Sequence, residues 1–193
     1  MTTKVLIILG HPEKDSFSAG LADAYEEGAG GADAEVRRLN LGDLRFDPIL
    51  HHDYDKEQRL EPDLQRAQAD IQWAEHIVFV YPTWWGTAPA LMHGFIERTF
   101  LPGFAFDYKE DDSGVKELLT GKSAHLIVTM NASPLAYKLL RGAPGHAMMK
   151  RSVLDICGVE PVRISEFGPL RDAGENLRKQ WLKEARKMGE DLR

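Results

Sequence analysis

The sequence predicts an α/β protein in which a five-stranded parallel sheet is doubly wound, with helices on both faces. Three short runs, residues 5–9, 77–81 and 126–128, are continuously apolar and rich in β-branched side chains, a pattern typical of parallel strands buried on both faces. Two other runs, 35–39 and 160–164, mix charged residues into a strand pattern. Helical patterns separate the five runs, and this β-α alternation with long crossovers is typical of a doubly wound sheet.

The second and fifth strands belong at the edges of that sheet. Charged side chains suit an edge strand, and Pro161, in the fifth, has no backbone N–H to donate to a neighbour. With these two strands outside, the strand order is 2-1-3-4-5, the flavodoxin-like order, whereas a six-stranded dinucleotide fold would need another strand. The helical patterns lie near residues 17–25, 64–74, 91–96, 148–156 and 177–188.

Length and composition indicate one domain, residues 1–193, of ordinary globular type. We interpret the charged, turn-rich stretches 41–62 and 107–121 as long loops or small excursions from it. The net charge of −6, with no cluster of Lys and Arg, argues against nucleic acid as a partner. Because the sequence has no signal-like start and no apolar run long enough for a membrane span, we expect a cytoplasmic protein without an integral membrane segment.

Several familiar motifs are incomplete. The turn after the first strand has one glycine where a dinucleotide fingerprint needs three, which disfavours direct NAD binding on a Rossmann turn. The motifs HExxH and GxSxG are absent, so the zinc-peptidase and α/β-hydrolase interpretations lack their catalytic residues. Cys157, at an apolar helix position, is expected to be a buried structural thiol. One group of residues resembles a metal cluster: His51, His52, Asp53 and Asp55. A solvated loop explains these residues better than a metal cluster does, so no metal site is expected.

Ligands in such a sheet bind outside the carboxyl ends of the strands at the switch point, here between the first and third strands. The loop after the first strand is rich in hydroxyls, and Ser16 or Ser18 is a natural N-cap. The free N–H groups of the first helical turn, together with the helix dipole, suit a phosphate. On this loop alone, the pattern does not distinguish phosphate binding from a simpler interpretation. In that interpretation the serines merely cap a helix and His11 is a polar loop residue.

The loop after the third strand carries two adjacent tryptophans, Trp84 and Trp85. Large aromatic residues in a loop can form a satellite core. However, Pro82 and Pro89 stiffen this loop and Gly86 allows close backbone approach, so a rigid aromatic wall for a flat ligand is the preferred interpretation. The other tryptophans lie at helical positions and are expected to pack: Trp73 and Trp181.

In these blocks the chain resembles the NAD(P)H:quinone oxidoreductases of the DT-diaphorase type, within the flavodoxin-like flavoproteins. The resemblance runs from residue 4 to about residue 168. The matching blocks are residues 11–17, Pro82-x-x-Trp85-x-x-x-Pro89 with Gly94-Phe95-x-Glu97-Arg98-x-Phe100, Gly103-Phe104-Ala105-Phe106-x-Tyr108, and Tyr137.

The resemblance implies a bound flavin, FAD being favoured over FMN, with NAD(P)H as electron donor. It places the flavin phosphates on His11, Ser16, Phe17 and Ser18. It places the isoalloxazine against Pro82, Thr83, Trp84 and Trp85, and its pyrimidine edge against the backbone of Thr129, Asn131 and Ala132. Two departures from the family pattern are visible. A Gly-Gly pair reads Asn131-Ala132 here, and the long C-terminal extension of the animal enzymes is missing.

The resemblance also implies how the site works. Tyr137 and His146 would support negative charge on the reduced flavin, although His146 is offset by a length difference. Trp85, Phe106 and Tyr108 would enclose a small planar acceptor such as a quinone, and the last two would cover the neighbouring subunit's site, since the family forms homodimers. The expected activity is two-electron reduction of quinones by ping-pong hydride transfer. Alternatives are an azo- or nitroreductase with the same flavin, a one-electron carrier, and a regulatory partner of a membrane transporter.

Overall fold

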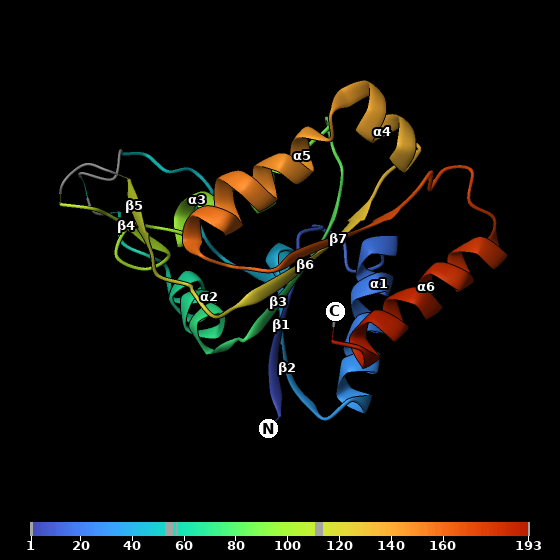
Figure 1. Ribbon diagram of the computed structural model, residues 1–193, viewed down its shortest axis with the longest axis horizontal. Helices are drawn as coiled ribbons and strands as arrows, with labels where there is room; N and C mark the ends of the chain where they lie inside the picture. Colours follow the sequence, from blue (N-terminus) through green and yellow to red (C-terminus); the bar gives the residue numbers. More distant parts are fainter. Residues whose placement is uncertain (1, 53–55, 57, 111–113, 193) are drawn as a thin grey trace.

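The computed structural model describes residues 2–52, 56, 58–110 and 114–192. Its centre is one sheet of five parallel strands in the order β2-β1-β3-β6-β7 (Figure 1). The order confirms the expected arrangement, in which the second and fifth strands of this sheet lie at the edges. The strands are β1 (Thr3–Leu9), β2 (Ala34–Asn40), β3 (His76–Pro82), β6 (Ser123–Thr129) and β7 (Val162–Phe167).

Helices cover both faces of the sheet. One face carries α1 (Phe17–Gly31) and α6 (Glu175–Glu190). The other carries α2 (Pro62–Trp73), α3 (Ala90–Thr99) and a helical segment of mixed type. That segment consists of α5 (Pro144–Ala147), a π-helical stretch (Met148–Leu154) and a 3₁₀ turn (Asp155–Cys157). Figure 1 shows α1 and α6 on one side of the sheet and α2 and α3 on the other.

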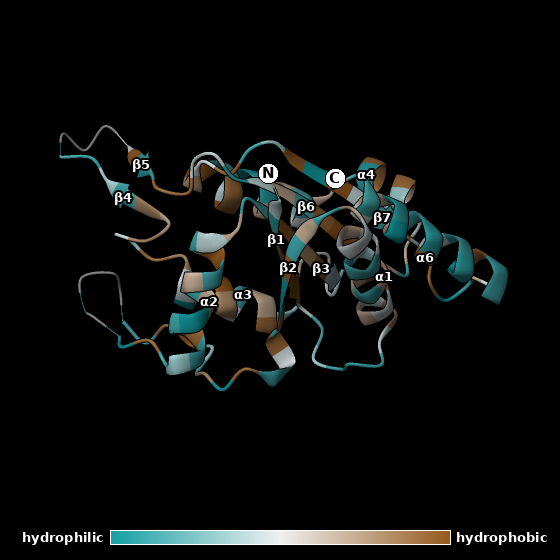
Figure 2. Cartoon of the chain, turned by 90° about the horizontal axis from the view of Figure 1, so that it is seen from below, coloured by the Kyte–Doolittle hydropathy of each residue, from teal (hydrophilic) through white to brown (hydrophobic). Residues whose placement is uncertain are grey.

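The central strands are buried because their side chains alternate between two apolar cores. In β1, Val5 and Ile7 pack toward α1 and α6, whereas Leu6 and Ile8 pack toward α2 and α3. Two-sided burial requires apolar residues at every position of the strand, which explains the continuous run. Figure 2 shows these hydrophobic residues in the strands between the two helix layers.

Close helix packing on the first face depends on two glycines. A Cβ on Gly28 of α1 would lie 2.0 Å from the carbonyl oxygen of Arg186, and a Cβ on Gly189 of α6 would lie 2.1 Å from that of Tyr25. The backbones of α1 and α6 therefore cross in direct contact. Near the other end of α6, Trp181 packs against Phe167 and Phe17, which confirms the expected packing of this tryptophan.

The two charged stretches interrupt the alternation, as expected. Residues 107–121 contribute to a small antiparallel hairpin of β4 (Phe106–Tyr108) and β5 (Val115–Glu117). After the 3₁₀ turn at Leu41–Asp43, the described residues before α2 form a long loop without helix or strand. This loop is fastened by Arg98 of α3, whose buried guanidinium donates to the carbonyl oxygens of Asp47 and Arg59 and to the Glu61 carboxylate.

The segment after β6 differs from the expected single helix. It begins earlier, with α4 (Pro134–Arg141) and α5, and then continues as the π-helical and 3₁₀ turns. A π-helical stretch has the same apolar spacing as an ordinary helix to within one residue, so the sequence pattern does not reveal it. Within the described parts of the chain, no helix is long and apolar enough to cross a membrane.

Candidate functional site

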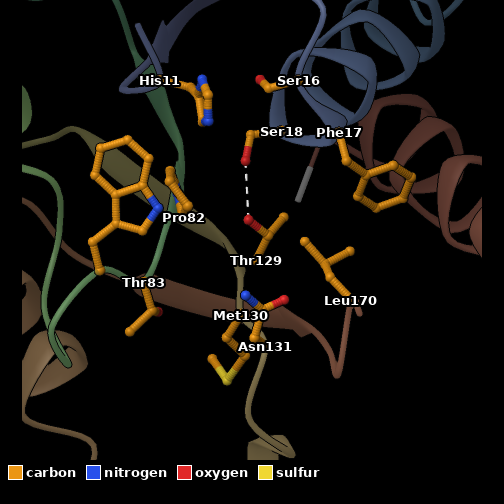
Figure 3. Close-up of a pocket in the computed structure, with 11 residues that line it drawn as sticks. His11, Ser16, Phe17, Ser18, Pro82, Thr83, Thr129, Met130, Asn131 and Leu170 are labelled. Carbon is orange, nitrogen blue, oxygen red and sulfur yellow. Dashed lines mark hydrogen bonds between the residues drawn. The ribbon is translucent and has the colours of Figure 1, made fainter. Parts of the chain in front are cut away.

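A pocket opens at the carboxyl ends of β1, β3 and β6, where the switch point of the sheet was expected (Figure 3). Three loops and the start of α1 supply most of its wall. The loop between β7 and α6 adds Leu170, whose N–H donates to the carbonyl oxygen of Met130 at 2.9 Å. The lining residues are His11, Ser16, Phe17, Ser18, Pro82, Thr83, Trp84, Thr129, Met130, Asn131 and Leu170.

The first loop places a helix N-terminus at the pocket. Ser16 is the N-cap of α1, and its hydroxyl oxygen accepts the N–H of Ala19 at 3.2 Å. Because the other N–H groups of a first helical turn have no partner within the helix, they can bind an anion such as a phosphate. Ser18 shares a buried hydrogen bond of 3.0 Å with Thr129 of β6, drawn as a dashed line in Figure 3. This bond fixes the start of α1 to the sheet.

His11 lies at the mouth of the same loop. Its ring meets Trp84 edge to face, with the ring centroids 5.4 Å apart. The backbone N–H of Glu13 donates to His11 Nδ1 at 3.0 Å, so Nδ1 carries no proton and Nε2 is left as the donor of a neutral ring. The loop therefore offers one imidazole N–H in addition to its backbone N–H groups.

The second loop contains a tight turn that separates the two adjacent tryptophans. Trp84 and Thr87 exchange backbone hydrogen bonds of 2.9 and 3.0 Å, and between them Trp85 and Gly86 both have positive φ, 53° and 84°. Trp84 is 44% exposed and lines the pocket, whereas Trp85 is fully exposed and does not. At the base of the loop, the N–H of Thr83 donates to the carbonyl oxygen of Thr129 at 2.7 Å.

Tyr137 of α4 and His146 of α5 lie together behind this turn, and neither lines the pocket. The Tyr137 hydroxyl donates to the carbonyl oxygen of Gly86 at 2.8 Å and accepts the N–H of Gly145 at 2.9 Å. Burial raises the pKa of Tyr137, and the charge of Glu166 adds to this effect, while the Gly145 N–H opposes it. The phenol therefore stays protonated and acts as a donor.

His146 contacts a carboxylate that was not among the candidate site residues predicted from the sequence. Its Nε2 lies 2.8 Å from Oε1 of Glu166 on β7, whose side chain is 7% exposed, and Lys138 contacts the other oxygen of that carboxylate. The only signal for Glu166 was its position just past the charged fifth strand, a pattern that indicated exposure at an edge.

The remaining predicted residues lie away from the lining. Phe106 and Tyr108 form an edge-to-face pair on β4, with ring centroids 5.7 Å apart. Their hairpin projects from the side of the sheet that carries α2 and α3 (Figure 1). Ala132 follows Asn131 but does not line the pocket. Asp53 and Asp55 fall outside the described residues, and among those that the structure does describe, no three His, Cys, Asp or Glu residues form a metal-binding group.

The model of a protein family described by its flavodoxin-like fold, Flavodoxin_2, matches residues 3–190. The chain belongs to this family. Among the relatives of this Flavodoxin_2 protein, an uncharacterized NAD(P)H oxidoreductase of Haemophilus influenzae is 28% identical over 180 residues, covering 90% of this chain and 88% of that protein.

Two further comparisons extend this likeness. NAD(P)H dehydrogenase [quinone] 1 of Cavia porcellus is 31% identical over 157 residues, which cover 70% of this chain and 56% of that enzyme. The chain thus spans just over half the length of the guinea-pig enzyme. The crystal structure of Smu.1420 from Streptococcus mutans UA159 superposes with a TM-score of 0.87 at 27% identity, covering 98% of this chain and 100% of that one.

Proposed function

We propose that this Flavodoxin_2 protein is a cytoplasmic, flavin-dependent NAD(P)H oxidoreductase that reduces quinones by two electrons in a ping-pong cycle. The observation that carries the proposal is the composition of the pocket. A helix N-terminus with serine hydroxyls suits a phosphate, and beside it the Trp84 indole forms a flat wall. The names of the relatives, NAD(P)H oxidoreductase and quinone dehydrogenase, support the same activity.

The described residues fit a flavin in two parts. His11, Ser16, Phe17 and Ser18 would hold its phosphate end, because all four line the pocket around the first turn of α1. Pro82, Thr83 and Trp84 would hold the ring system, with the backbone of Thr129 and Asn131, which line the pocket, along its polar edge. The backbone of Ala132, the next residue, would extend that edge beyond the lining. When bound, the flavin supplies the hydride chemistry that side chains lack. The family resemblance favours FAD over FMN.

Tyr137 and His146 keep the role that the resemblance implies, which is to stabilise negative charge at the ring. They would act from behind the Trp84–Thr87 turn, since the Tyr137 proton points to the carbonyl oxygen of Gly86 and His146 Nε2 faces Glu166. Hydrogen-bond donors that are preorganised near a site of developing negative charge lower the energy of the transition state.

The acceptor side of the site is proposed to be completed by a second copy of the chain. Trp85 is fully exposed beside the pocket wall, so it is available to stack on a planar acceptor. Phe106 and Tyr108 do not line their own pocket, and Tyr108 is exposed on the hairpin. This arrangement supports a homodimer in which the hairpin covers the neighbouring subunit's site.

Steady-state NAD(P)H oxidation by flavin-loaded protein, with and without menadione, tests the proposal. We expect turnover that depends on the acceptor, and its absence would overturn the reductase assignment. An azo dye or nitroaromatic compound in place of menadione distinguishes the alternative acceptors, and HPLC of the flavin released by heat identifies FAD or FMN. In matched variants, Trp84→Ala should raise the flavin dissociation constant, whereas Trp85→Ala should mainly raise the KM for the acceptor.

A further inference from the structure

Glu166 places a buried carboxylate at the carboxyl end of the sheet. Its side chain is 7% exposed, and it lies on β7 opposite Val128 of β6. Two side chains meet it, His146 with Nε2 2.8 Å from Oε1 and Lys138 with Nζ on Oε2. Burying a carboxylate is costly unless it is paired in this way. The two contacts therefore fasten α4, through Lys138, and α5, through His146, to the same point of β7.

The chain between these two contacts turns through a strained corner. Gly142 ends α4 at φ 70°, and the next residue, Ala143, also lies in the left-handed region at φ 46° and ψ 56°. A residue with a Cβ is unfavourable in that conformation and keeps it only where the surroundings enforce it. The two contacts of Glu166, with Lys138 and with His146, lie on either side of this corner, where they can help to hold it.

Tyr137 connects the corner to the pocket. Its ring packs edge to face on His146, with the ring centroids 5.2 Å apart, and its hydroxyl donates to the carbonyl oxygen of Gly86. Gly145 lies so close that a Cβ there would be 2.9 Å from the Tyr137 hydroxyl and 3.0 Å from that same carbonyl oxygen. Tyr137 is the one buried residue of α4, so little else in this helix can hold the turn.

We propose that Glu166 is a positioning residue for the pocket: by binding Lys138 and His146 it holds the α4–α5 corner, and through Tyr137 it holds the Trp84–Thr87 turn. The inference rests on the proposed function only where it concerns the flavin. Trp84 is the member of the turn that lines the pocket, so a displaced turn would move the wall against which the ring system packs.

The positioning role is tested first without a flavin. In protein labelled with 5-fluorotryptophan, the four tryptophans are assigned by Trp→Phe variants and compared by ¹⁹F NMR in the wild type and in Glu166→Gln. We expect the resonances of Trp84 and Trp85 to shift or broaden and those of Trp73 and Trp181 to stay. Glu160→Gln, the same change at an exposed carboxylate, is the control and should leave all four in place. Unchanged Trp84 and Trp85 resonances in Glu166→Gln would refute the proposal.

Flavin affinity then tests the path through Tyr137. Glu166→Gln and Tyr137→Phe should each raise the FMN dissociation constant about tenfold. The dissociation constant of the double variant should be only slightly higher than that of the single variant that binds FMN less tightly, because the effects of residues in one network are not additive. Additive effects, about a hundredfold in the double variant, would show that Glu166 does not act through Tyr137. A residue that only stabilises the fold would lower the urea midpoint and leave the affinity of the folded protein unchanged.

Two outcomes are kept separate from these. If the wild type binds neither FMN nor FAD, the proposed function fails, while the fluorine spectra still decide the positioning role. If Glu166→Gln does not fold, Lys138→Met takes its place in both measurements, because it removes one of the two contacts and its side chain is 53% exposed. For Lys138→Met we again expect the Trp84 and Trp85 resonances to shift or broaden and the FMN dissociation constant to rise. Unchanged resonances would again refute the proposal.

Discussion

Replacing Arg98 by methionine should destabilise the protein strongly, because it removes the anchor of the long loop between β2 and α2. The guanidinium is fully buried. Nη2 donates to Glu61 Oε2 at 3.0 Å and to the carbonyl oxygen of Arg59 at 3.1 Å, while Nη1 donates to the carbonyl oxygen of Asp47. Methionine fills most of the same space without a donor, so the change isolates the loss of these bonds.

The magnitude follows from the two kinds of bond. Breaking a buried ion pair costs about 3–5 kcal/mol, and the lower end applies here because Glu61 is 29% exposed and can be rehydrated. The carbonyl oxygens that lose a donor add about 1 kcal/mol. We therefore expect a loss of about 4 kcal/mol in the free energy of unfolding, or about 10 °C in Tm for a domain of this size.

Urea unfolding at pH 7 measures the effect, with Arg66→Met as a matched control. Arg66 pairs with Asp63 on the surface of α2 and is 71% exposed, so its loss should cost less than about 0.5 kcal/mol. An Arg98→Met loss below about 1 kcal/mol, or an equal loss in both variants, would refute the reasoning.

Acid provides a second check on the same pair. Burial by itself would raise the pKa of Glu61, but the backbone N–H groups of Asp47 and Glu61 and the charge of Arg98 outweigh it, and the pKa is lowered. A carboxyl with a lowered folded-state pKa contributes stability above its unfolded pKa and loses it as pH falls through the folded value. The difference between the wild type and Arg98→Met should therefore shrink in acid.

Three further predictions concern helix packing, the thiol and the pocket. Gly28→Ala should lower the urea midpoint strongly, by about 3 kcal/mol or more in stability, since its Cβ meets the α6 backbone, whereas Gly30→Ala has open space and should be neutral or stabilising by about 0.5 kcal/mol. Burial, together with a nearby carboxylate, raises the pKa of Cys157 to about 12, so DTNB at pH 8 should react only as the protein unfolds; rapid reaction would contradict this. Ser18→Ala leaves the Thr129 hydroxyl without this partner and should cost about 1–2 kcal/mol in urea unfolding, with weaker flavin binding.

The sequence predicts the sheet well because burial on two faces and exposure at an edge leave different marks on composition. Val5 to Leu9 had to be apolar at every position, and the charges in β2 mark it as an edge. The pocket loops followed from the strand order, since parallel strands present their carboxyl ends together. These inferences need only periodicity and topology.

Other parts of the site depend on backbone geometry that composition does not encode. Trp84 and Trp85 are identical neighbours, and only the turn, with φ positive at Trp85 and Gly86, directs one to the pocket and the other to solvent. Leu170 is an apolar loop residue that no motif marks, and the hydrogen bond from its backbone N–H to Met130 holds it beside the pocket. Glu166 lies just past the predicted fifth strand and the sequence did not single it out, because its two partners, Lys138 and His146, come from distant positions in the chain.

The pocket draws its lining from residues between His11 and Leu170, carried by the ends of β1, β3 and β6 and the loop after β7. Melting of any one of these segments removes part of the site, so unfolding releases a bound ligand and binding opposes unfolding. A ligand at a free concentration one hundred times its dissociation constant should then stabilise the whole sheet by about 2.7 kcal/mol. The cell's supply of free cofactor would in this way control how long the protein survives proteolysis.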